Sequence, residues 1–198
     1  MKKLLRIDSS ARQSDSISRQ LADVLQARIE QQGAVTVQKR DLYYEELVKL
    51  GNEDQVNGYF TPADQQTEAQ QHAVAGSNIL ATEFAQADEY LFAVPMYNFG
   101  VSAALKTYID LISRVGVTFK YGEGFPIGLL ENKKAYVIVV TGGTPLESDY
   151  DFVIPYLKVF LNFVGITNIE FIKAASTRNN IEQALIDAKN NINTLEIS

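Results

Sequence analysis

Short apolar runs alternate with helix-like segments along most of the chain. Five of these runs have the length and composition of strands and cover residues 3–8, 34–39, 89–94, 135–140 and 168–172. The intervening segments carry apolar residues at the three- to four-residue spacing of a helix face. This alternation favours parallel strands joined by right-handed crossovers, so the sequence predicts an α/β fold.

Helices are expected where the helical spacing persists. The spacing marks residues 17–32, 63–87, 102–114, 153–164 and 181–195. Pro155 is compatible with its helix only in the first turn, because a later proline would break it. Residues 41–62 and 117–130 are rich in helix breakers and are expected to be irregular.

Bulk composition limits the class of protein. The 198 residues contain no linker-like stretch, which predicts a single domain over residues 1–198. No apolar run approaches the roughly 20 residues that span a bilayer, and the start MKKLLRID lacks a signal-like stretch, so a cytoplasmic protein without membrane attachment is expected. The sequence has no cysteine, which excludes disulfides and thiolate chemistry. The net charge of −6 disfavours binding to nucleic acid.

Three loops that follow expected strands form the candidate site, because open parallel sheets bind ligands beyond the carboxyl ends of their strands. These loops are residues 9–18, 95–100 and 141–146. The first is rich in serine where a helix opens, and hydroxyls beside free helix N–H groups can cradle a monophosphate. On composition alone, a polar loop with a helix cap is the more favoured interpretation. Asp15 would repel a phosphate unless Arg12 or Arg19 balances its charge.

Other candidate groups are weaker. Gly142 and Gly143 directly follow a buried run, where they either admit a flat ligand or form an ordinary turn. The run from Gly122 to Gly128 precedes a strand and does not have the spacing of a dinucleotide fingerprint. His72 lies in a glutamine-rich helix and is expected at the surface. No catalytic side chain and no metal site is predicted, so the chemistry is best assigned to a bound cofactor.

The segment PMYNF at 95–99 closely resembles a motif of the FMN-dependent NADH-azoreductase family, also described as NADH:quinone oxidoreductases. The likeness runs nearly end to end, and GVTF at 116–119 makes it highly specific. Further matching segments are 9–10, 40–42, 105–106, 108–110, 133–135, 142–143, 155–157 and 163–166. The resemblance implies a flavodoxin-like, doubly wound five-stranded parallel sheet with helices on both faces, and a homodimer with its flavin sites near the subunit interface.

The resemblance also assigns roles to residues. It implies that the FMN phosphate is held by Ser10, Ser16, Ile17 and Ser18, and that the flavin ring lies against Met96, Tyr97, Asn98, Phe99, Val140, Thr141, Gly142 and Gly143. Phe119 and Phe160 or Phe163 match aromatic residues that shape the substrate pocket over the flavin. The implied activity is ping-pong two-electron transfer from NADH through FMN to quinones, and reductive cleavage of aromatic azo compounds to amines. We further expect the backbone N–H groups of Asn98, Gly142 and Gly143 to face the polar edge of the flavin.

Departures from the family pattern concern substrate range. The pattern admits a serine and an arginine at the positions of Val140 and Thr141, and a histidine at that of Pro145, so polar contacts to the flavin or acceptor are expected to be reduced. Two other functions stay open. One is a non-catalytic electron carrier of the flavodoxin type, and the other is an acyl carrier protein phosphodiesterase, an old label in this family. Steady NADH turnover with small acceptors would separate the enzyme from the carrier.

Overall fold

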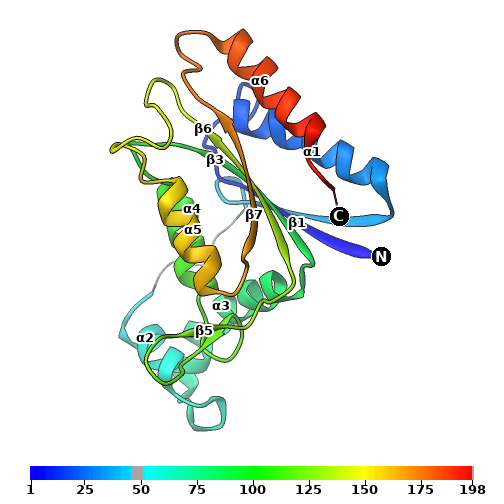
Figure 1. Ribbon diagram of the computed structural model, residues 1–198. Coiled ribbons are helices and arrows are strands. Elements are labelled where there is room, and N and C mark those ends of the chain that lie inside the picture. The colour runs from blue at the N-terminus through cyan, green and yellow to red at the C-terminus, as the bar shows by residue number, and fades with distance from the viewer. Residues whose placement is uncertain (46–50, 198) are drawn as a thin grey trace.

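The centre of the structure, a computed structural model that describes residues 1–45 and 51–197, is a five-stranded parallel sheet (Figure 1). Its strands are β1 (Lys2–Asp8), β2 (Val35–Asp41), β3 (Glu89–Pro95), β6 (Lys134–Val140) and β7 (Asn168–Ala174). Their order is β2-β1-β3-β6-β7, and every neighbouring pair is parallel. The α/β prediction is therefore confirmed, and this strand order is the doubly wound order of flavodoxin-like folds.

Helices cover both faces of the sheet (Figure 1). One face carries α1 (Ile17–Gln32) and α6 (Ile181–Thr194), and the other carries α3 (Glu68–Gln86), α4 (Ala103–Ile112) and α5 (Ile154–Phe163). Side chains of β3 alternate between the two cores, so that Tyr90 and Phe92 pack under α3 to α5 while Leu91 and Ala93 pack under α1 and α6. Burial on both faces explains why the central strands are apolar throughout. Among the described helices, none is long and apolar enough to cross a membrane.

Side-chain caps fix where several helices begin. Ser16, Ser102 and Asn180 each accept a hydrogen bond from the backbone N–H three residues further on. Thr67 opens α3 with a full capping box. Pro155 lies in the first turn of α5, as predicted, where its missing N–H costs no intrahelical bond.

The stretch 41–62, expected to be irregular, contains a helix, so that prediction is partly wrong. Helix α2 (Glu53–Phe60) begins after its cap Asn52 and packs on α3. Gly58 makes this approach possible, because an added Cβ would lie 2.7 Å from Val74. The helix expected from residue 63 begins only at Glu68, after the short 3-10 helix η1 (Ala63–Gln65). Residues 46–50 of the stretch lie outside the described residues.

The loop after α4, also expected to be irregular, contains two short antiparallel strands, β4 (Phe119–Lys120) and β5 (Ile127–Gly128). This hairpin packs against the end of α5, where the N–H of Leu130 donates to the carbonyl of Val164 at 2.9 Å. A Cβ on Gly128 would overlap the backbone of Gly165, so this glycine serves close packing. The glycine-rich run of residues 122–128 thus lies in a hairpin and opens no helix.

Candidate functional site

Four strands end at the same edge of the sheet. Asp8 lies beside Ala93 in the register, and Val140 lies between Pro95 and Ala174. A cavity of about 610 Å³ opens at this edge, lined by the loops after β1, β3, β6 and β7 and by the first residues of α1 and α6. Its volume is in the range of small-molecule and cofactor sites. Doubly wound sheets bind their ligands at this edge, beside the point where the strand order reverses.

The loop after β1 supplies an anion cradle. Ser10, Ser16, Ile17 and Ser18, the predicted phosphate-binding residues, all line the cavity. The Oγ of Ser16 accepts a hydrogen bond from the N–H of Arg19 and lies 3.2 Å from the Oγ of Ser18. Within the described part of the chain, no group accepts a hydrogen bond from the N–H of Ile17 or Ser18. Free N–H groups at the positive end of a helix attract an anion.

The charges of this loop are balanced beside the cradle. Nη1 of Arg12 lies 2.9 Å from Oδ2 of Asp15, and both side chains are mostly exposed. Of the two arginines expected to balance Asp15, Arg12 is therefore its partner. An exposed pair of this kind adds little stability, but it neutralises the carboxylate that would otherwise repel a phosphate.

A buried cluster of charged side chains holds the same loop to the ends of β1 and β2. Arg19 binds the two carboxylate oxygens of Asp41 at 2.5 and 2.8 Å and donates to the carbonyl of Ser10 at 2.7 Å. Asp8, fully buried at the end of β1, lies 3.2 Å from Arg19 and 3.0 Å from Lys39. Burial has the largest single effect on Asp41 and raises its pKa. The hydrogen bonds from Arg19 and from the N–H of Tyr43, together with the charges of Arg19 and Lys39, outweigh burial and hold the pKa below its ordinary value. Arg19 thus fixes the cradle to the end of β1 and to β2.

Tyr97 joins the second loop to the first. Its hydroxyl accepts a hydrogen bond from the N–H of Ala11 at 3.1 Å, while the hydroxyl of Tyr44 donates to the carbonyl of Ala11 at 2.6 Å. Met96 and Tyr97 both line the cavity, and the N–H of Met96 donates to the carbonyl of Val140 at 2.8 Å. These bonds hold the predicted ring-binding loop between the cradle and β6.

A tight turn follows Tyr97. Tyr97 and Gly100 exchange backbone hydrogen bonds of 2.9 and 3.1 Å around Asn98 and Phe99, whose φ angles are 46° and 71°. Left-handed backbone is costly for phenylalanine, and such strain clusters at functional sites. The cavity lining does not include either residue, and Phe99 lies half exposed, with its ring 6.1 Å from that of Tyr150. No described residue accepts a hydrogen bond from the N–H of Asn98.

The loop after β6 presents bare backbone, that is, backbone not covered by side chains, at Gly142 and Gly143. Val140 and Gly142 line the cavity, whereas its lining does not include Gly143. A Cβ on Gly142 would meet only a carbon 4.0 Å away, and one on Gly143 would meet nothing within 4 Å. Protein packing therefore requires neither glycine, and the space over them is available to a ligand. Thr141 is buried, and its hydroxyl donates to the carbonyl of Thr144 at 2.7 Å.

A fourth loop, residues 175–180 after β7, was not among the three predicted loops. Thr177 and Arg178 of this loop line the cavity, as does Ile181 at the start of α6. The N–H of Arg178 donates to the carbonyl of Gly142 at 2.8 Å. The composition of this loop gives no indication that it lines a ligand site, but the strand order does. Because β7 neighbours β6 in parallel, its carboxyl end reaches the same edge of the sheet.

The predicted aromatic pocket residues lie elsewhere in this chain. Phe119 begins β4, Phe160 and Phe163 lie in the last turn of α5, and the rings of Phe119 and Phe163 are 4.5 Å apart. Helices α4 and α5 begin at the carboxyl edge and run away from it for ten residues each, about 15 Å (Figure 1). The structure therefore does not bring these rings together with the predicted cofactor residues of the same chain.

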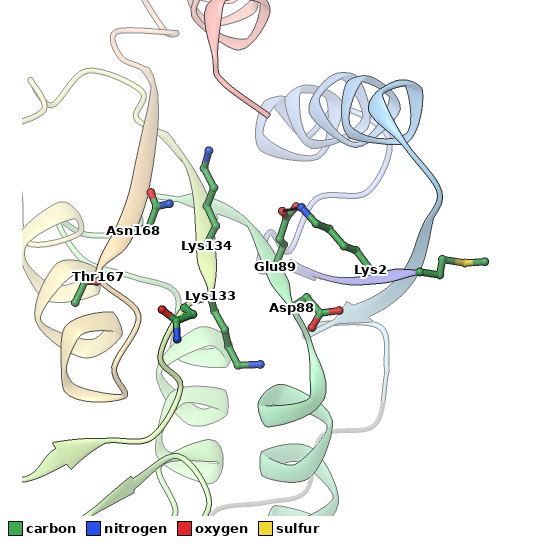
Figure 2. A pocket seen from close by; sticks show the side chains of 9 residues that line it. Lys2, Asp88, Glu89, Lys133, Lys134, Thr167 and Asn168 are labelled. Carbon is green, nitrogen blue, oxygen red and sulfur yellow. Dashed lines mark hydrogen bonds and ion pairs between the residues drawn. The ribbon is translucent and has the colours of Figure 1, made fainter. Parts of the chain in front are cut away.

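A second cavity, of about 700 Å³, opens at the opposite edge of the sheet (Figure 2). Three lysines line it, and each has a partner. Lys2 pairs with Glu89 at 2.9 Å, Lys133 donates to carbonyl oxygens at the end of α3, and Lys134 donates to the carbonyl of Glu196 at 2.6 Å. These contacts tie strand and helix ends together, so the three lysines of this cavity serve structure.

The fold and the first cavity define a class: a flavodoxin-like α/β protein with an anion cradle and bare backbone at the carboxyl edge of its sheet. The chain belongs to the family described as flavodoxin-like fold, whose model matches residues 2–195.

Relatives of the chain carry more specific names. It is 47% identical over 191 residues to FMN-dependent NADH:quinone oxidoreductase 1 of Hahella chejuensis, a match that covers 96% of this chain and 93% of the relative. It is 38% identical over 185 residues to the protein of the same name from Colwellia psychrerythraea, covering 93% and 95%. The crystal structure of an azoreductase from Bacillus anthracis str. Sterne superposes with a TM-score of 0.86 at 29% identity, covering 98% and 96%. An FMN-dependent NADH-azoreductase from Bacillus anthracis str. Ames Ancestor, solved in complex with FMN, shares the fold with a TM-score of 0.86 at 24% identity, covering 97% and 96%.

Proposed function

We propose that this chain is an FMN-dependent oxidoreductase that takes two electrons from NADH and passes them to a quinone, and that it cleaves aromatic azo compounds to amines by the same route. The observation that carries the proposal is the cavity at the carboxyl edge, which combines an anion cradle at the start of α1 with bare backbone after β6. The names of the relatives specify the cofactor, the donor and the two classes of acceptor.

The residues of the cavity fit FMN. A 5′-phosphate needs hydrogen-bond donors, and Ser10, Ser16 and Ser18 supply hydroxyls beside the free N–H groups of the helix start. A flat ring needs a surface free of side chains, which Gly142 provides, and Met96 supplies an apolar contact. FMN, when bound, supplies the hydride and electron chemistry that amino-acid side chains lack.

The protein's own residues bind and orient in this proposal. The N–H groups of Asn98, Gly142 and Gly143 have no acceptor among the described residues, and fixed donors of this kind stabilise negative charge on the polar edge of a ligand. Asp15 is the one carboxylate among the described lining residues, and it is already paired with Arg12. His72 is exposed on α3, as predicted. The lining therefore contributes position and electrostatics rather than a proton-transfer group.

The absorption spectrum of the purified protein, reconstituted with FMN, tests the proposal. NADH under nitrogen should bleach the flavin bands, and a quinone should restore them. One NADH should be consumed per quinone and two per azo bond, because full cleavage of an azo bond takes four electrons. Absence of bleaching, or of recovery, would rule the cycle out. A single-electron carrier would bind FMN without steady NADH oxidation, and a phosphodiesterase would act without flavin.

We also propose a homodimer in which the second chain completes the pocket over each flavin. Phe119 follows α4, and Phe160 and Phe163 lie in the last turn of α5, so all three come after helices that lead away from the cavity of their own chain. Exposed aromatic side chains lie both on the β4–β5 hairpin, where Phe125 is 82% exposed, and near the 97–100 turn, where Phe152 is 61% exposed. Apolar surface of this kind is typical of protein interfaces. Light scattering tests the proposal, and a monomer at micromolar concentration would contradict it.

We propose that the whole chain forms a single domain acting in the cytoplasm. The two apolar cores lie on opposite faces of one sheet, which supports the single domain. A sequence without cysteine is compatible with a reducing compartment. Fractionation of cells that produce the protein would test the location.

A further inference from the structure

We propose that Arg178 recognises the phosphate of the flavin and makes this cavity prefer FMN over riboflavin. The inference rests on the proposed flavin function and adds a specificity-determining residue to it. It assigns a charged partner to a phosphate that the predicted residues would hold with neutral donors alone.

The charges that line the cavity single out Arg178. Arg12, Asp15 and Arg178 are the charged residues among the described lining. Arg12 and Asp15 neutralise each other at 2.9 Å. No described carboxylate lies within ion-pair distance of Arg178, so its guanidinium is the uncompensated positive charge of the lining. A phosphate monoester carries roughly −1.5 to −2 charges at pH 7, and the planar guanidinium suits its geometry.

Hydrogen bonds between the loop after β7 and the loop after β6 fix the position of the Arg178 backbone. Its N–H donates to the carbonyl of Gly142 at 2.8 Å. Thr177 donates to the carbonyl of Thr141 through its N–H at 3.1 Å and through its hydroxyl at 2.9 Å. The N–H of Ser176 adds a bond to the hydroxyl of Thr141 at 3.4 Å. The backbone of Arg178 is therefore held on the β7 side of the cavity by bonds that any side chain at 178 except proline would keep.

The cradle and Arg178 occupy neighbouring walls of the same cavity. The cradle lies at the start of α1, and Arg178 comes three residues before Ile181, the first residue of α6, which also lines the cavity. Both helices pack on the same face of the sheet. The side chain of Arg178 is exposed in the free protein, so its long aliphatic stem can carry the guanidinium group to a phosphate bound at the cradle. Exposure also limits the size of the effect.

Titration of the flavin-free protein with FMN and with riboflavin tests the proposal, because the two ligands differ only in the phosphate. Quenching of flavin fluorescence reports binding of either ligand without turnover. Arg178→Gln should weaken FMN binding about three- to tenfold at low ionic strength and leave riboflavin binding unchanged. Arg178→Lys should keep most of the FMN affinity. Lys189→Gln is the matched control, because it removes the same charge from the exposed surface of α6.

Salt provides a second measurement. Raising the ionic strength should weaken FMN binding to the wild-type protein and reduce the difference between it and Arg178→Gln, because an exposed charge is screened. The proposal is overturned if Arg178→Gln weakens FMN and riboflavin equally, if Lys189→Gln has the same effect, or if Arg178→Gln alters only the KM for NADH. A wild-type protein that binds neither flavin would overturn the proposed function itself, and this inference with it.

Discussion

Replacing Gly142 with valine tests whether a ligand, rather than the protein, needs bare backbone after β6. A Cβ at this position would meet only the Cβ of Arg178, at an ordinary contact distance of 4.0 Å, and the backbone is not in the left-handed region. The Cβ of valine should therefore fit without a clash, and the side chain of Arg178, which is exposed, can move away from the methyl groups. Because losing a glycine restricts the unfolded chain, the free energy of unfolding of the flavin-free protein should stay the same or rise by up to about 1 kcal/mol.

A flavin ring lying over Gly142 would meet the added methyl groups. Overpacking of this size costs about 1 to 3 kcal/mol, which corresponds to a rise of about five- to 150-fold in Kd. Fluorescence titration should show the same loss for FMN and riboflavin, because they share the ring, and Gly142→Ala should fall between the wild type and valine. Gly33→Val is the control. A Cβ on Gly33 meets nothing within 4 Å, but this residue lies at the far end of α1, so both affinities should be unchanged.

Two results would refute this reasoning. Undiminished flavin affinity in Gly142→Val, beside a wild type that binds FMN, would mean that the glycine pair is an ordinary turn. A loss of several kcal/mol in the unfolding free energy of the flavin-free variant would mean that protein packing requires the glycine, contrary to the open space over it.

Three further predictions concern the loop that carries the cradle. Tyr97→Phe removes the acceptor of the Ala11 N–H bond, so titration should show FMN binding weakened roughly two- to tenfold with little change in thermal unfolding; an unaltered Kd would mean that the link does not order the cradle. Arg19→Leu removes the two hydrogen bonds that Asp41 receives from Arg19, while the buried Asp8 keeps Arg6 and Lys39, and the free energy of unfolding in urea should fall by about 3 kcal/mol; a loss below about 1 kcal/mol would show that Arg6 and Lys39 suffice to hold the cluster. The pKa of Asp41 is lowered from 3.8, so its stabilisation is present above that value and is lost as the pH falls through the lower folded value; the wild type should therefore lose stability below about pH 4 more steeply than Asp41→Asn, and identical acid curves would contradict the assignment.

The central strands show how far sequence patterns reach. Strands β3 and β6 are buried on both faces, so each appears in the sequence as a continuous apolar run, and each predicted run ends within one residue of the observed strand. Strand β2 lies at the edge of the sheet and is partly exposed, and the predicted run 34–39 misses its last two residues. A boundary is therefore predictable where burial alone sets it. It is less predictable where pairing with a neighbouring strand sets it, as at Arg40 and Asp41, which pair with Ile7 and Asp8 of β1.

Helix α2 shows why a local pattern can mislead. Asn52 and Gly58 lie in the stretch 41–62, which is expected to be irregular because residues of these types usually break helices. In the structure, Asn52 caps the helix, and Gly58 lets it approach Val74 on α3. The second role depends on a partner helix that follows later in the chain. Propensity alone could not supply that information.

The same distinction applies to the candidate site: some of its parts follow from local sequence, and others follow only from the tertiary arrangement. The first three loops were predictable because each directly follows an apolar strand, and parallel strands bring their carboxyl ends to one edge. The fourth loop depends on the position of β7 beside β6, which the composition does not encode. Where the three predicted aromatic residues lie depends on the direction in which α4 and α5 run from the site. Phe119 follows a ten-residue helix, about 15 Å long, that starts at the site and leads away from it, so Phe119 lies beyond the far end of that helix. In the proposed homodimer, these rings would cover the flavin of the second chain, so each active site would contain residues of both chains.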